Sequence, residues 1–227
     1  MPPLNGPLVL NDFRSTLEMA RKYDMDAAFR HLIDGMGSKV LRDSPLEAFC
    51  AAYDRELGEA ARIAARASLK HRLNLDDIGE KLRHTNYWHG PALHKLWKYH
   101  RACSAAAIAG ISSCTFPWIT PTTWSSAANC SCGTAGVAKY RFILGPGRIE
   151  WLANASWKNY IDRAVVALRE HPCSEAVTNH AILQSSYEGV MCNQCLRRIY
   201  GLSEFSRMLG EEIERIVSYV RELLRLS

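Results

Sequence analysis

The chain has 227 residues, enough for one domain or two small ones. Hydrophobic residues (48%) and charged residues (22%) are close to the average for globular proteins, which argues against a disordered, collagen-like or membrane-spanning chain. The net charge of +5 is not gathered into a Lys/Arg stripe, which argues against a nucleic-acid partner, and eight cysteines are too few for a disulfide scaffold. Because no signal peptide is recognisable, we expect an intracellular protein, cytoplasmic or nuclear, with reduced cysteines.

Apolar residues recur every three or four positions through the first 110 residues, which is the period of helices with one buried face. The start of one helix is well defined, because Ser44 and Glu47 form a capping box around Pro45. The pattern predicts consecutive helices over about 12–22, 25–36, 45–53, 56–72, 74–82 and 91–109.

Residues 111–148 have a different composition. Ten of these 38 residues are Ser or Thr, four are Gly, three are Pro, and none is acidic. Only Val137 to Leu144 favours a short strand, and Gly145 to Gly147 form a turn. We therefore predict a linker or a long irregular loop here.

The helical period returns after this segment. We predict one helix from Arg148 to His171-Pro172, a second from Ser174 or Thr178, and a last one from Ser203. The last helix has apolar residues on one face and charges on the other, which is typical of a helix docked on a bundle or on a partner. The predicted fold class is all-α, a helical array or bundle with a long irregular insertion that could contain one short strand pair. Its three parts are residues 1–110, 111–148 and 149–227.

Several stretches, taken in order and spacing, resemble the C-terminal helical part of fungal BTB/POZ domain-containing proteins. They are Leu17–Met25 (LEMARKYDM), Ala60–Leu69 (AARIAARASL), Leu93–Cys103 (LHKLWKYHRAC), and a C-terminal set made of Trp151, His171-Pro172-Cys173, the Cys192/Cys195 pair and the helix from Phe205 to Val220. The resemblance implies that residues 1–110 correspond to the end of a BTB domain plus BACK-like helices. The strand-rich N-terminal half of that domain, which forms most of its dimer interface, has no counterpart here. The resemblance therefore implies a truncated, adaptor-like protein.

Four cysteines form a candidate zinc centre: Cys130, Cys132, Cys192 and Cys195. The C-x-x-C spacing of the second pair is that of zinc fingers, and zinc takes four thiolates in a tetrahedron. The alternative is that they are small buried thiols in a helical core. A zinc centre predicts about one zinc per chain, and less than about 0.2 zinc per purified chain would contradict it.

No residue pattern indicates catalysis. The sequence has no nucleophile elbow, phosphate-binding glycine loop, dinucleotide fingerprint or kinase signature. His89, His94 and His100 are five and six residues apart, and they do not converge on one metal as an i, i+4 pair does. We therefore predict no catalytic residue, no cofactor and no small-molecule substrate, with an enzyme of unrecognised site as an alternative.

Two tryptophans, Trp118 and Trp124, lie in the polar insertion. They either anchor this segment on the helices or form a hot spot for a partner. Taken together, the patterns predict a non-enzymatic protein–protein interaction module that resembles a truncated BTB-type adaptor, with a protein partner whose identity the sequence does not give. A zinc-stabilised binding module is the alternative.

Overall fold

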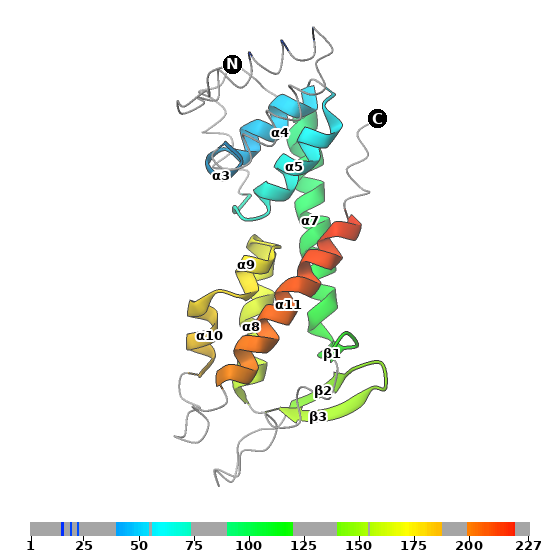
Figure 1. Cartoon of the computed structure of the whole chain (residues 1–227), viewed down its shortest axis with the longest axis vertical. Helices are drawn as coiled ribbons and strands as arrows, with labels where there is room; N and C mark the ends of the chain where they lie inside the picture. The colour runs from blue at the N-terminus through cyan, green and yellow to red at the C-terminus, as the bar shows by residue number, and fades with distance from the viewer. Residues whose placement is uncertain are drawn as a thin grey trace, which may run out of the picture. The chain divides into compact units, whose positions relative to one another are not determined.

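The computed structural model describes residues 40–54, 56–73, 90–119, 140–153, 155–187 and 199–220, together with helical positions at Ser15, Met19 and Lys22. These residues are mainly helical, which confirms the predicted helical class, and they include a small three-stranded sheet (Figure 1). Their contacts divide the chain into two compact units, one of residues 1–99 with 223–227 and one of residues 100–222. None of the described helices combines the length and apolar character that a membrane span requires.

The first unit contains α3 (Val40–Asp43), α4 (Pro45–Asp54), α5 (Gly58–Ser68) and the first turns of α7 (Gly90–Ser112). Pro45 begins α4 as predicted, since the first helical position needs no N–H donor. α4 and α5 pack on each other, and alanines dominate their buried faces, which lets the two backbones approach closely. The helices predicted over 25–36 and 74–82 lie outside the described residues, as does most of the one predicted over 12–22.

The second unit contains the last turns of α7, the sheet, α8 (Ala155–Glu170), α9 (Ser174–Val177), α10 (His180–Tyr187) and α11 (Ile199–Val220). α8 ends directly before His171-Pro172 as predicted, because a proline disfavours the helical conformation of the residue that precedes it. The helix predicted from Ser174 or Thr178 is two helices, α9 and α10, which are separated at Thr178 and Asn179.

The sheet has the strand order β1 (Thr115–Phe116), β2 (Tyr140–Leu144), β3 (Ile149–Ala153). β1 pairs with β2 in parallel, and β2 pairs with β3 antiparallel. β2 lies within the predicted strand region, whereas β1 lies in a segment predicted to be irregular. Residues 120–139 of that segment lie outside the described residues.

The prediction that a helix begins at Arg148 is wrong, because residues 149–153 form β3. Gly145 and Arg148 both adopt positive φ (69° and 53°), and the Arg148 N–H donates to the Gly145 carbonyl at 3.1 Å. This turn reverses the chain and brings Trp151 opposite Phe142 in the antiparallel register. Pairing with β2 therefore outweighs the helical period that Trp151 shares with α8.

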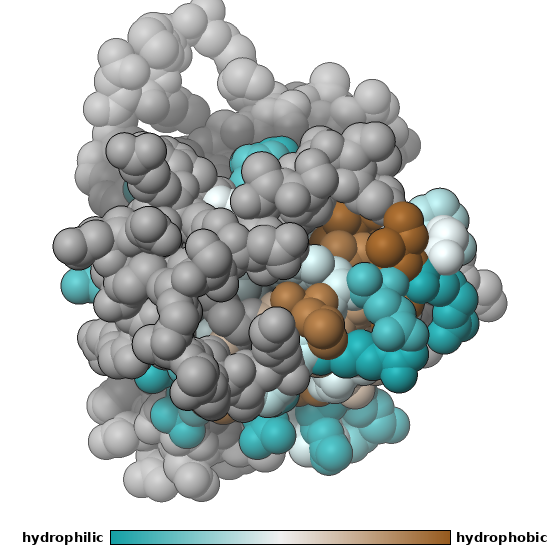
Figure 2. Space-filling view, turned by 90° about the horizontal axis from the view of Figure 1, so that it is seen from below, coloured by the Kyte–Doolittle hydropathy of each residue, from teal (hydrophilic) through white to brown (hydrophobic). Residues whose placement is uncertain are grey.

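The outer part of the β2–β3 hairpin is partly apolar. Ile149 and Leu152 of β3 are 51% and 53% exposed. The surface of the molecule, seen from below, shows hydrophobic residues among hydrophilic ones (Figure 2). On the face that carries Leu152, Arg141 and Glu150 form an ion pair across the two strands. Exposed pairs of this kind contribute little to stability, so the hairpin depends on its other, buried face.

Aromatic rings around Phe205 of α11 form the core of the second unit. Phe205 is only 1% exposed, and its ring centroid lies 5.1 Å from those of Phe116 and Trp157. The ring of Tyr160, one turn further along α8, lies 5.9 Å from it. Edge-to-face arrangements at these distances are the favoured geometry of aromatic pairs. One side chain of α11 thus contacts both the sheet and α8.

The cluster continues across the buried face of the sheet. Phe142 stacks on Phe116 at 5.8 Å, and Trp151 meets Trp157 edge-to-face at 4.7 Å. Phe142 and Trp151 are also cross-strand neighbours, with ring centroids 5.7 Å apart. The sheet, α8 and α11 therefore share one set of packed rings.

Two glycines let helices approach α11 closely. A Cβ placed at Gly110 of α7 would lie 2.7 Å from the Ile216 Cδ1 of α11, and one at Gly210 of α11 would lie 3.0 Å from the Thr178 Cγ2. Contacts that close leave no room for an added methyl group without movement. α11 is thus the helix on which α7 and α9 converge within this unit.

Removing the central ring tests its role in stability. We expect Phe205→Ala to lower the free energy of unfolding by about 3–5 kcal/mol, because it deletes a buried ring and leaves a cavity. Tyr219→Ala is the matched control, since Tyr219 is on the same helix and 68% exposed. The control loses only an exposed cation–π contact with Arg215 and should change stability by less than about 1 kcal/mol. Urea unfolding followed by tryptophan fluorescence measures both, and equal losses in the two variants would contradict the central role of Phe205.

Candidate functional site

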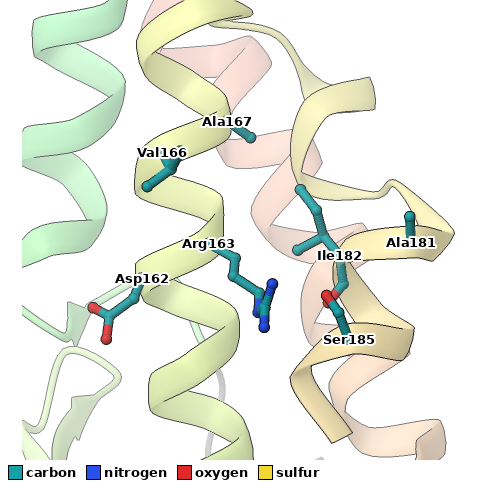
Figure 3. A pocket seen from close by; sticks show the side chains of 7 residues that line it. All are labelled: Asp162, Arg163, Val166, Ala167, Ala181, Ile182 and Ser185. Carbon is teal, nitrogen blue, oxygen red and sulfur yellow. The ribbon is translucent and has the colours of Figure 1, made fainter. Parts of the chain in front are cut away.

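A shallow groove of about 540 Å³ lies between α8 and α10 (Figure 3). Its lining residues are Asp162, Arg163, Val166 and Ala167 of α8, and Ala181, Ile182 and Ser185 of α10. Carbon atoms make up most of its surface, and Val166 is 61% exposed. In other proteins, apolar grooves between helices bind small apolar ligands or amphipathic helices.

The two faces of α8 explain why the groove forms on it. One side of the helix is buried, and it is formed by residues spaced three or four positions apart: Trp157, Tyr160, Ile161, Ala164 and Leu168. Val166 lies outside this stripe and remains exposed. Arg163 and Ala167 lie beside the stripe, on the flank where α10 packs (Figure 3).

The second wall of the groove is α10, and hydrogen bonds hold the helix that precedes it, α9, in place. The Val177 carbonyl accepts from the Tyr160 hydroxyl at 2.8 Å and from the Ser206 hydroxyl at 3.2 Å. The Glu214 carboxylate of α11 accepts from the Ser174 N–H at 3.1 Å, which satisfies a donor at the start of α9. α9 is therefore joined to both α8 and α11.

α10 begins directly after α9. The Asn179 side chain accepts from the Ala181 N–H at 2.8 Å, which is the bond of an N-cap residue. Ser186 is fully buried, and its hydroxyl donates to the Ile182 carbonyl at 2.6 Å. The cap and the bonds to α9 set where Ile182 lies relative to α8.

Of the two charged side chains that line the groove, Asp162 has an ion-pair partner among the described residues and Arg163 does not. Asp162 forms an ion pair with Lys158, one turn earlier on α8. Arg163 has no hydrogen-bond or ion-pair partner among the described residues, and its side chain extends toward Ile182 and Ser185 (Figure 3). Among the described residues, the groove therefore has a mostly apolar lining and one cation, Arg163, that has no acidic partner.

Two of the described cysteines, Cys114 and Cys173, do not have the properties of nucleophiles. Burial raises the pKa of the Cys173 thiol to about 11, and the nearby Glu175 carboxylate acts in the same direction while the Ala176 N–H opposes it. Burial also raises the pKa of Cys114, against the effect of the Lys158 ammonium. Because the thiolate is the reactive form, both thiols are weak nucleophiles at neutral pH.

The predicted partner-binding tryptophan Trp118 lies against the aromatic core. Its ring stacks on Phe205 at 5.9 Å and meets Phe116 edge-to-face at 5.8 Å, and the side chain is half-buried. The other predicted site residues lie outside the described residues: Trp124, Cys130, Cys132, Cys192 and Cys195. The zinc centre therefore stays a prediction. Among the residues with a described position, no three His, Cys, Asp or Glu side chains come together as metal ligands do.

The sequence patterns did not single out the groove. One signal in α8 could have done so: Val166 is a large apolar residue that does not belong to the buried stripe of its helix. The other wall, α10, could not be predicted from the sequence in this way, because its packing beside α8 depends on contacts between residues of different helices.

No family model matches the chain, and comparisons with curated proteins and with solved structures find no match. Residue patterns and the geometry of the groove are the basis for a functional proposal.

The buried Cys173 thiol makes stability depend on pH. Its ordinary pKa is 9.0, so as pH rises from about 9 to about 11 the unfolded thiol ionises while the folded one stays protonated, and stability falls. We expect this decline in the unfolding free energy to be smaller in Cys173→Ala than in the wild type. Urea unfolding at several pH values across this window measures it. Identical slopes in the two proteins would show that the thiol is not protected by burial.

Proposed function

We propose that this chain is a non-enzymatic protein–protein interaction module that binds a segment of another protein in the groove between α8 and α10. The observation that carries the proposal is the exposed Val166 beside an apolar groove. Burying apolar surface is favourable by about 25 cal/mol per Å², so a partner that covers this face gains binding free energy from it.

The polar groups of the groove support binding rather than catalysis. Asp162 is held by Lys158, and the Ser185 hydroxyl donates to the Ile182 carbonyl at 3.2 Å. An acid, a base or a nucleophile would need to converge on a common point with a free donor or acceptor. Within the described groove only the Arg163 guanidinium is available, and arginine does not deprotonate in proteins.

The resemblance to the C-terminal helical part of fungal BTB/POZ proteins supports the same class of function. In that family the helices belong to adaptors, which act by binding other proteins inside the cell. The proposal therefore includes an adaptor-like, BTB-type role in the cytoplasm or nucleus. Its contact surface in this proposal is the groove between α8 and α10.

Site-specific cross-linking tests the proposal. We expect the full chain carrying p-benzoylphenylalanine in place of Ser185 to give discrete cross-linked protein bands in its host cell. The same chain with Val166→Asp should lose them, because a carboxylate in an apolar contact is left desolvated and unpaired. Leu152→Asp is the control, since Leu152 is comparably exposed on β3 and does not line the groove. Bands that survive Val166→Asp but not Leu152→Asp would contradict the proposed site.

A further inference from the structure

We infer that the segment which binds in the groove is a short amphipathic helix with a carboxylate side chain about one turn away from its apolar anchor. The inference rests on the proposed function and names the chemistry of its partner. It follows from two features of the groove, the charge of Arg163 and the geometry of its two helical walls.

The charge selects an acidic partner. Arg163 reaches across the groove toward Ile182, and no acidic side chain among the described residues pairs with it (Figure 3). The neighbouring Asp162 carboxylate is paired with Lys158, so it does not supply the counter-charge of Arg163. A guanidinium binds a carboxylate through two parallel hydrogen bonds, and apolar surroundings strengthen the attraction. A basic segment at this position would instead be repelled.

The walls select a helix rather than an extended strand. A bound strand gains its affinity from backbone hydrogen bonds to a sheet edge, whereas α8 and α10 use their backbone groups within themselves. Ala167 and Ala181 are small, so a third helix can approach both walls closely. The groove therefore fits the helix-in-groove mode of recognition, in which a few apolar side chains act as anchors.

The spacing follows from α8. Arg163 and Ala167 are four residues apart on one face, a separation of about 6 Å between side chains. A partner helix has the same period, so a carboxylate opposite Arg163 lies three or four residues from the apolar side chain that covers Ala167. This spacing distinguishes the predicted partner from other acidic segments.

Selection from a peptide library tests the inference. A displayed library of helical peptides of about 16 residues, randomised on one face, is selected on the full chain and counter-selected on its Val166→Asp variant to retain groove binders. We expect Asp or Glu three or four positions from a large apolar residue among the selected peptides. A parallel selection on Arg163→Glu should instead enrich Lys or Arg at that position.

Affinity measurements give the matched comparison. A peptide selected on the wild type should lose about tenfold to a hundredfold in affinity for Arg163→Glu, the range for a hydrogen bond to a charged group. Arg169→Glu is the control, because Arg169 is exposed on the same helix and does not line the groove, and it should change the affinity by less than about threefold. Circular dichroism of each variant checks that it is folded.

The outcomes separate the two proposals. Groove-binding peptides without acidic enrichment, or equal losses for Arg163→Glu and Arg169→Glu, would overturn the inference and leave the proposed function standing. A library in which no peptide depends on Val166 would contradict both.

Discussion

The contact of Phe205 with Trp157 and Tyr160 is the constraint on which the second unit depends. These rings fix the rotation of α8 about its own axis, because they must all point at α11. At 3.6 residues per turn, Val166 lies about 180° around the helix from Trp157. The core therefore dictates that Val166 faces away from it. The exposure of Val166 on α8 therefore follows from how the aromatic cluster packs.

The second wall depends on hydrogen bonds rather than on rings. The Val177 carbonyl accepts from Tyr160, a residue of the aromatic cluster, so the core and α9 share a side chain. From there the Asn179 cap starts α10 and places Ile182 beside α8. The groove is thus formed by two elements that are each tied to Tyr160, directly or through α9. A rigid pair of walls reduces the conformational entropy that binding would otherwise cost.

Much of the helical architecture is predictable from the sequence, because helix signals are local. Pro45 and His171-Pro172 mark the start of α4 and the end of α8 through their effect on adjacent backbone. β3 is not predictable in the same way. Trp151 fits a helical period with Ala155 and α8, and only its pairing with Phe142 across the turn decides for a strand. In the sequence, Arg163 likewise has the pattern of an ordinary exposed charge. Its place in the groove depends on Ile182, which lies on another helix.

The position of a bound peptide on the protein tests the central claim most directly. Titrating a peptide, selected on the full chain without counter-selection, into the ¹⁵N-labelled protein would show by amide chemical-shift changes where it binds. The account predicts that the largest changes fall on residues 162–167 of α8 and 181–185 of α10. Changes centred instead on residues 149–152 of β3, with α8 and α10 unaffected, would contradict it.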